Sequence, residues 1–379
     1  MSPLDLIERA LRQGIVYPFL RLLCRNPVIE GPINLANVKR MLVFRYDRIG
    51  DMVVTLPVLR VLKRRSPGTE LVVLASRTNA ELLKGSGLVD DLFVLESNWF
   101  KFFAQVMELR RKRFDVVLNF VFNRTTTPAI LANLISPEGS KIGQGPSRYA
   151  FYFNRILQLP RFQRHMSEQL AVFVSETFGI TISEEELQPA MEVPAAQQAV
   201  VDMWLRNNCL HRRREGGGQS SPYVVFNLSA KGWQRKISAQ QGIVLAAHLA
   251  GHTEFRTVIV HAPDDSFMRS TIERHSEFER CLLFRTQGPS PLYQLASLIG
   301  GAIAVITPDT SIVHFASAMN TPLLGIYGEY QGVEWEPYRV RHHTIRSEHG
   351  APASAIEPSV LVGKTDEFIA EVMNDRKRV

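Results

Sequence analysis

The sequence predicts an α/β protein made of two similar halves, each built on a parallel sheet. Short apolar runs typical of buried parallel strands alternate with helix-like runs over most of the chain. This pattern begins near residue 40 and starts again near residue 223, after a segment at 180–195 that is rich in glutamate and proline. With 379 residues, the chain is also too long for one typical core. Together these observations predict two α/β domains with a cleft between them.

The first half contains five predicted strands. An apolar strand over 40–46 leads through a turn into a helix over 52–65. Pro57 either marks the first turn of this helix, capped by Thr55, or bends the helix. The remaining predicted elements of this half are strands at 71–75, 92–95, 116–121 and 141–143, and helices at 79–84, 99–113, 127–135 and 167–178.

The second half repeats the alternation. Its predicted strands are 223–228, 257–261, 282–284, 302–306 and, as the last strand, 322–327, and its predicted helices are 195–207, 239–249, 267–275, 292–299 and 359–377. Three arginines and three glycines at 211–221 indicate a surface loop. The helix that ends the chain is a candidate to pack against the first domain.

The composition is typical of a globular protein, and the net positive charge predicts that it binds an anionic partner. Hydrophobic residues make up 45% of the chain and charged residues 21%, while the net charge is +7 and the isoelectric point about 9.4. The alternation of aromatic and basic residues found in RNA-binding sheets is absent, which places nucleic acid low among the partners. Cys24, Cys209 and Cys281 lack the spacing of a zinc site, and so sparse a count suits a reducing compartment.

The first 37 residues lack an apolar run of the roughly 20 residues that a membrane-spanning helix needs. Their charged start and the lack of a small-residue cleavage site argue against a signal peptide. Two interpretations stay open. The segment is either a helix packed on the first domain or a basic amphipathic stretch that lies on a membrane surface.

The segment 307–318 combines an acid, hydroxyls and a histidine directly after an apolar strand. Asp309 or Thr310 can cap the helix that follows, and its free N–H groups favour a phosphate. His314 lies one turn into this helix. The alternative is an ordinary junction between strand and helix with a partly buried histidine.

Gly50 and Asp51 follow the first strand. A carboxylate at this position can act as a general base on an incoming hydroxyl, and glycine lets a ligand approach the backbone. Alternatively, Asp51 only caps the next helix. Arg45, Asp47 and Arg48 crowd the same turn, where they either bind an anionic acceptor or neutralise one another.

A third candidate segment, 227–236, brings Ser229 and three cations into a loop before a helix capped by Ser238. Such a loop suits a diphosphate by charge pairing, although basic loops are common on surfaces. The chain contains no Walker loop, no G-x-G-x-x-G and no G-x-S-x-G. Asp264 and Asp265 fit a helix cap better than a metal site.

With these motifs the chain resembles glycosyltransferase family 9, the heptosyltransferases of lipopolysaccharide core assembly. The segment 45–57 is similar to the family's signature at strand one, with its Gly-Asp and Leu-Pro. The segments 307–318, 320–322 and 325–328 are similar to its C-terminal donor signature, and 335–338 to a following tryptophan–proline element. The resemblance covers about residues 38–345 and leaves the N-terminal segment outside.

The resemblance implies a GT-B fold, with two Rossmann-like domains whose parallel sheets face a central cleft. The expected parts are an N-terminal helical extension at 1–37, an acceptor domain at 38–190, a nucleotide-sugar domain at 191–350 and a C-terminal helix at 351–379. It also implies sugar transfer with inversion, without a metal or other cofactor, and Asp51 as the general base. The expected donor-binding residues are Ser229, Arg235, Lys236, Asp309, Thr310, Ser311 and His314.

Two departures from the family pattern affect the donor site. Ser311 stands where the family has glycine after Asp-Thr, and Arg235–Ser238 replaces a basic–aromatic–proline element. Arg235 is the first choice by position for the cation that meets the phosphate. Basic residues of the first domain are expected at the acceptor, although each has a solvated surface position as its alternative. The acceptor candidates are Arg48, Gly50, Arg60, Arg124 and Arg148, with Lys63, Arg64 and Arg65 on the same predicted helix as Arg60.

The activity that the resemblance implies is transfer of heptose or a related sugar, most simply from ADP-heptose, to an anionic bacterial glycolipid or glycan. Cytoplasmic location, with a possible peripheral contact on the inner membrane, goes with this activity. Two alternatives remain. An epimerase of the same fold would bind a nucleotide sugar without an acceptor, and a non-catalytic protein would only bind the nucleotide sugar.

Overall fold

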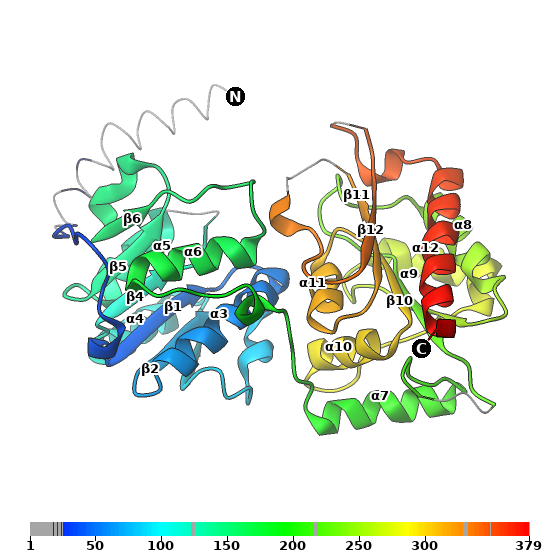
Figure 1. Ribbon diagram of the computed structural model, residues 1–379, viewed down its shortest axis with the longest axis horizontal. Helices are drawn as coiled ribbons and strands as arrows, with labels where there is room; N and C mark the ends of the chain where they lie inside the picture. Colours follow the sequence, from blue (N-terminus) through cyan, green and yellow to red (C-terminus); the bar gives the residue numbers. More distant parts are fainter. Residues whose placement is uncertain are drawn as a thin grey trace. The chain divides into compact units, whose positions relative to one another are not determined.

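We describe a computed structural model of the chain, shown in Figure 1. The structure describes residues 26–122, 126–215, 219–328, 333–348 and 350–378, together with Pro18, Arg21 and Cys24. By contacts between residues, the described chain divides into two compact units. The first unit runs up to Arg48 and then over Pro57–Leu187, and the second comprises Ile49–Leu56 and the chain from Gln188 onward.

The first unit contains a six-stranded sheet with the order β3-β2-β1-β4-β5-β6. All of its paired strands are parallel. From β1 the chain adds strands first toward one edge of the sheet and then, from β4 onward, toward the other edge. The boundary between β1 and β4 is therefore the topological switch point, where open α/β sheets bind ligands. The strands are β1 (Arg40–Arg45), β2 (Glu70–Ala75), β3 (Asp91–Val94), β4 (Val116–Asn119), β5 (Ser140–Gln144) and β6 (Arg155–Leu157).

Helices cover this sheet because each presents an apolar face to it. Buried side chains of β1, β2 and β4 pack with those of α4 and α5 in one core cluster. The α-helices are α3 (Ile49–Arg65), α4 (Trp99–Arg111), α5 (Thr126–Ile135) and α6 (Met166–Phe178), and the 3₁₀ helices are η2 (Leu35–Asn37), η3 (Ala80–Leu83), η4 (Ser147–Tyr152) and η5 (Glu185–Leu187).

The second unit repeats the same topology. Its parallel sheet has the order β12-β11-β10-β7-β8-β9, so its switch point lies between β7 and β10. The strands are β7 (Tyr223–Asn227), β8 (Arg256–Val260), β9 (Leu282–Leu283), β10 (Ala304–Pro308), β11 (Leu323–Tyr327) and β12 (His342–Arg346).

One core cluster joins this sheet to its helices. The α-helices are α7 (Ala195–Asn207), α8 (Ala239–Ala250), α9 (Ser266–Arg274), α10 (Pro291–Gly301), α11 (Ser311–Ala318) and α12 (Pro358–Arg378), and the 3₁₀ helices are η6 (Ser276–Arg280), η7 (Val333–Trp335) and η8 (Ala353–Ala355). Helix α12 lies beside α8 (Figure 1) and adds Leu361, Phe368 and Ile369 to the core of the second unit. The apolar stripe of this helix is therefore buried in the second unit.

The α/β class with two parallel sheets is confirmed, and each predicted strand forms with its ends shifted by a few residues. Two strands escaped prediction. β6 has only three residues, and β12 reads His-His-Thr-Ile-Arg at the edge of its sheet. An edge strand buries less surface, so its sequence need not be apolar. The segment 322–327 is therefore not the last strand.

Helix α3 starts three residues earlier than predicted and continues through Pro57. Thr55 does not cap it. Its hydroxyl donates to the carbonyl of Asp51 at 2.7 Å, one turn back in the helix. Since proline has no N–H, the helical ladder loses one hydrogen bond at Pro57. The division between the two units falls at this same residue.

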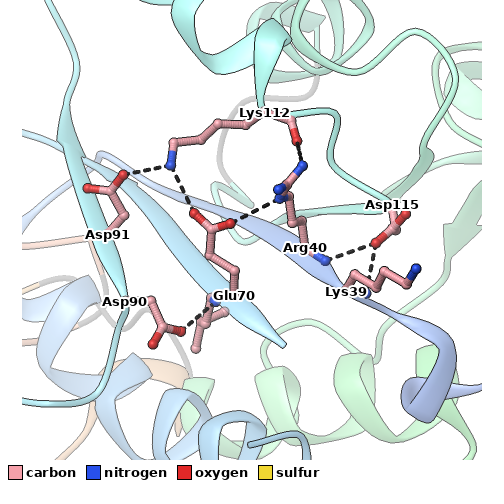
Figure 2. Close-up of polar contacts among 8 residues, drawn as sticks. Lys39, Arg40, Glu70, Asp90, Asp91, Lys112 and Asp115 are labelled. Atoms are coloured by element: carbon pink, nitrogen blue, oxygen red, sulfur yellow. Dashed lines mark hydrogen bonds and ion pairs between the residues drawn. The ribbon is translucent and has the colours of Figure 1, made fainter. Parts of the chain in front are cut away.

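An ion-pair network holds the amino ends of the first strands together, as Figure 2 shows. Glu70 on β2 accepts from Arg40 on β1 at 3.0 Å and from Lys112, just after α4, at 2.9 Å. Lys112 also pairs with Asp91 on β3 at 2.9 Å. The hydrogen bond from Lys112 holds the pKa of Glu70 below its ordinary value. The network therefore ties the C-terminal end of α4 to three strands at their amino ends, on the opposite side of the sheet from the carboxyl ends.

Two of the three arginines of 211–221 are packed rather than solvated, in contrast to the predicted surface loop, while Arg214 is exposed. Arg212 pairs with Asp202 at 2.6 Å and donates to the hydroxyl of Ser297 at 2.8 Å. Arg213 donates to the carbonyls of Asn320 at 2.8 Å and Met319 at 3.0 Å. Both side chains thus link segments of the second unit, a role that sequence spacing does not show.

Among the described helices, none combines the length and the apolar character that crossing a bilayer requires.

Candidate active site

The carboxyl ends of β7 and β10 flank the switch point of the second unit, and polar residues follow both strands. Asn227, the last residue of β7, is buried and connects the two loops. Its side-chain amide donates to Thr307 Oγ1 at 2.9 Å, to Thr310 Oγ1 at 3.4 Å and to the carbonyl of Ser229 at 2.9 Å. This buried network fixes the two loops relative to each other.

Of the two residues predicted to cap helix α11, Thr310 is the one that does so. Its hydroxyl oxygen accepts from the N–H of Ile312 at 3.2 Å. Ser311 is the first residue of the helix and is partly exposed. The N-terminus of α11, with its partial positive charge, therefore lies beside the switch point.

Asp309 and Arg235 form an ion pair between the loops. Arg235 Nε lies 3.3 Å from Asp309 Oδ2, and the two side chains are 25% and 15% exposed. Lys236, by contrast, is exposed. The carboxylate limits the motion of the guanidinium and holds it at the start of α11. Of the two predicted cations, Arg235 is the one that the fold positions.

The loop that carries Arg235 is fixed by backbone contacts. The N–H of Ala353 donates to the carbonyl of Gln234 at 2.8 Å. A Cβ atom at Gly328, which follows β11, would lie 2.0 Å from that same carbonyl oxygen and 2.9 Å from the nitrogen of Ala353. Glycine is required here because the backbones come too close for any side chain.

Ser229 and His314 are both buried. The hydroxyl oxygen of Ser229 accepts from the N–H of Ala262 at 3.0 Å, which ties the loop after β7 to the end of β8. The ring of His314, on α11, packs edge-to-face against Trp335 with 5.9 Å between centroids. Trp335 belongs to the tryptophan–proline element that the sequence analysis identified.

By their contacts, the first residues of α3 belong to the second unit. A Cβ atom at Gly50 would lie 2.6 Å from Cδ2 of His314, so the histidine ring occupies the space that a larger residue would need. Asp51, in the first turn of the helix, is 4% exposed. It lies inside the helix and is not its N-cap, which removes the capping alternative for this residue.

The turn before α3 carries three charged residues, and two of them pair with each other. Arg45 is buried, pairs with Asp47 at 3.1 Å and donates to the carbonyl of Phe120 at 2.5 Å, across the switch point of the first sheet. Arg45 and Asp47 thus neutralise each other, whereas Arg48 is exposed.

The other acceptor candidates come from separate elements of the first unit. Arg60 on α3 is partly buried, and Arg148 on η4 is exposed with its guanidinium 4.9 Å from the ring centre of Tyr149. Arg124 lies outside the described residues. Lys63, Arg64 and Arg65 on α3 are ion-paired within the first unit, Lys63 with Asp90 and the two arginines with Glu186.

Tyr327, at the end of β11, is a candidate that sequence reasoning named only as part of a motif. Its side chain is 6% exposed, and its hydroxyl has no hydrogen-bond partner among the described residues. Burial, with the negative charges of Asp309 and Glu336, raises its pKa well above the ordinary value. The hydroxyl therefore stays protonated and can donate.

A possible metal-ligand group lies away from these loops. His248 on α8, His252 just after that helix and Asp366 on α12 offer ligand atoms within 4.8 Å of one another. In the described structure His248 Nε2 contacts Asp366 Oδ1 at 2.6 Å, so the group works as a polar clamp between two helices. Asp265 caps α9 by accepting from the N–H of Met268, as predicted.

Comparisons with known proteins agree with this architecture. The family model "Glycosyltransferase family 9 (heptosyltransferase)" matches residues 103–361. Lipopolysaccharide heptosyltransferase 3 of Escherichia coli is 24% identical over 303 residues, covering 76% of this chain and 83% of that protein. Lipopolysaccharide core heptosyltransferase OpsX of Haemophilus influenzae is 22% identical over 330 residues, covering 84% and 89%.

Solved structures show the same fold. A glycosyl transferase family 9 protein from Veillonella parvula has a TM-score of 0.71 at 16% identity, covering 90% of this chain and 100% of that one. E. coli ADP-heptose lps heptosyltransferase II has a TM-score of 0.66 at 19% identity, covering 88% and 99%. E. coli heptosyltransferase WaaC with ADP has a TM-score of 0.63 at 18% identity, covering 88% and 98%.

Proposed function

Because the chain belongs to glycosyltransferase family 9, we propose that it transfers heptose from ADP-heptose to a lipopolysaccharide core or related bacterial glycan, with inversion and without a metal. The chain is a glycosyltransferase with the GT-B fold. The finer proposal is supported by relatives named as lipopolysaccharide heptosyltransferases and by a similar structure that contains ADP. In this proposal residues 38–190 form the acceptor domain and 191–350 the nucleotide-sugar domain.

The observation that carries the proposal is the polar junction at β7 and β10. There Asn227 connects two loops, Thr310 caps α11, and Asp309 holds Arg235 beside the N-terminus of that helix. A diphosphate at this place would meet backbone N–H groups, a positive dipole end and a guanidinium. Such donors stabilise the negative charge that develops on the leaving group.

Asp51 supplies the other half of the chemistry. Its carboxylate takes the proton of the acceptor hydroxyl while the hydroxyl oxygen bonds to the anomeric carbon. The bond from that carbon to the diphosphate oxygen breaks, and its electron pair leaves with ADP. Since attack and departure occur on opposite faces, the configuration inverts. Basic residues of the first domain bind the anionic acceptor, at the cytoplasmic face of the inner membrane.

Nucleotide binding tests the donor half. We expect calorimetric titration to show that ADP binds more tightly than UDP or GDP. Arg235→Gln should weaken ADP binding by about tenfold, the equivalent of about 1.4 kcal/mol, while Lys236→Gln on the exposed neighbour should change little. Preference for UDP or GDP would reject the heptose donor. Equal effects of the two substitutions would reject the role of Arg235.

Turnover tests the general base. Asp51→Asn keeps the shape of the side chain but removes its basicity, so turnover should fall by about 10²–10⁴ while ADP affinity is kept. A variant with nearly the normal rate would contradict the assignment. Turnover of the donor sugar without any acceptor would indicate an epimerase instead.

A further inference from the structure

Helix α4 exposes an unusual amount of apolar surface. Trp99 is 74% exposed, Phe100 83%, Phe103 62% and Met107 38%. Single exposed apolar residues are common, but an apolar patch that is contiguous on one surface usually marks a binding site. On a helix, residues 99, 103 and 107 form one row, and residue 100 lies beside it.

This patch lies beside the face that α4 buries. Val106 and Leu109 are fully packed in the core of the first unit, and Phe102 packs against that core. Trp99 stacks on Phe102 with 6.1 Å between ring centres, so the exposed row is continuous with a packed aromatic layer. The apolar surface of the helix is therefore wider than the face that the core buries.

Leu134, on the neighbouring helix α5, extends the patch because it is 46% exposed. Arg110 of α4 connects the two helices by donating to the carbonyl of Leu134 at 3.3 Å. We call these five apolar residues, Trp99, Phe100, Phe103, Met107 and Leu134, the α4 patch.

Cations lie at one end of the patch. Arg110 and Arg111 are exposed in the last turn of α4, three and four residues beyond Met107, whereas Lys101 and Glu108 are exposed on the helix face opposite the patch. Lys112 is not available to this surface, since it pairs with Glu70 and Asp91 in the network of Figure 2. Because that network fixes the end of α4 to the sheet, the helix presents the patch in one orientation.

We propose that the α4 patch is a membrane-docking surface that binds anionic phospholipid. Aromatic side chains partition into the interfacial region of a bilayer, and basic residues beside them are attracted to anionic headgroups. The excess of cations at its border favours such a surface over a protein partner, whose interface would bury charge at a cost. The inference adds to the proposed function the place where the enzyme meets the membrane that carries its acceptor.

Vesicle co-sedimentation tests the surface without any donor or acceptor sugar. The full chain should bind vesicles of phosphatidylglycerol and phosphatidylethanolamine, bind phosphatidylcholine vesicles weakly, and lose binding as salt increases. Replacing Trp99, Phe100 and Phe103 together by serine should weaken binding at least about tenfold. Phe267→Ser, on the 59% exposed Phe267 of α9, is the matched control and should bind normally.

A second variant removes charge and leaves the aromatic residues in place. Arg110→Glu with Arg111→Glu should also weaken binding to the anionic vesicles and reduce its dependence on salt. ADP affinity should stay normal in both variants, so a failure of this surface and a failure of the proposed donor are distinguishable.

Three results would overturn the proposal. These are a chain that binds neither kind of vesicle, binding that the serine and glutamate variants leave unchanged, and a concentration-dependent dimer in solution that the serine variant abolishes. The last result would assign the patch to a second copy of the chain.

Discussion

Replacing Gly328 by alanine tests the backbone contact that supports the donor site. Gly328 follows β11 and lies against the loop that carries Arg235. The added Cβ would lie 2.0 Å from the carbonyl oxygen of Gln234 and 2.9 Å from the nitrogen of Ala353. Real Cβ contacts stay beyond 3.0 Å, so the carbonyl must move by about 1 Å.

The magnitude follows from two effects. Overpacking against a rigid backbone costs about 1–3 kcal/mol. The shift also disrupts the hydrogen bond of 2.8 Å between Ala353 and Gln234, which contributes about 1 kcal/mol. The second unit should therefore lose about 2–4 kcal/mol of unfolding free energy, a fall of roughly 5–15 °C in its melting temperature.

Thermal and urea unfolding measure the loss, and calorimetry with ADP measures its effect on the site. ADP affinity should fall about tenfold, since Arg235 is the neighbour of the displaced Gln234. The control is Gly363→Ala in helix α12, where the added Cβ meets nothing within 4 Å. That variant should be more stable by about 0.5–1 kcal/mol, because alanine favours a helix.

The reasoning would be refuted by a Gly328→Ala variant with the normal melting temperature. It would also be refuted if Gly363→Ala destabilised the protein as strongly, since the two sites differ in the contact and not in the substitution.

Three further predictions concern single residues. Thr310→Val should lower stability by about 1 kcal/mol through loss of the α11 cap and weaken ADP binding, whereas Thr310→Ser should keep both, as measured by unfolding and calorimetry. Burial lowers the pKa of Lys141 to about 8 in the folded state. Between pH 8 and the ordinary value of 10.5 the unfolded chain therefore binds more protons, so the stability of the protein should rise with pH relative to Lys141→Met; parallel curves in urea unfolding would contradict this. Tyr327→Phe removes a buried hydroxyl that has no partner among the described residues, so stability should be unchanged or higher, and a fall in ADP affinity would show that the hydroxyl contacts the donor.

Local signals in the sequence determined most of the architecture. The apolar runs placed the predicted strands, because residues buried on both faces of a parallel sheet must be apolar. Ser238 with Gln241 forms the capping box of α8, and Thr310 caps α11, because caps depend on residues only two or three positions apart. The choice of Arg235 as the cation that meets the phosphate came from the family resemblance and stays a prediction.

Features that depend on distant residues were decided by tertiary structure alone. The strand β12 forms from a polar segment because β11 offers it an edge, and α12 is buried on the second unit because an apolar stripe does not specify its partner. Arg212 lies in a sequence typical of a solvated loop, yet Asp202 and Ser297 bind it. Likewise, the sequence does not show that position 328 requires glycine. The requirement comes from the backbone of Gln234, which lies 94 positions earlier in the sequence and packs against Gly328. Sequence spacing reports neighbours along the chain, whereas these residues obtain their roles from neighbours that only the folded chain supplies.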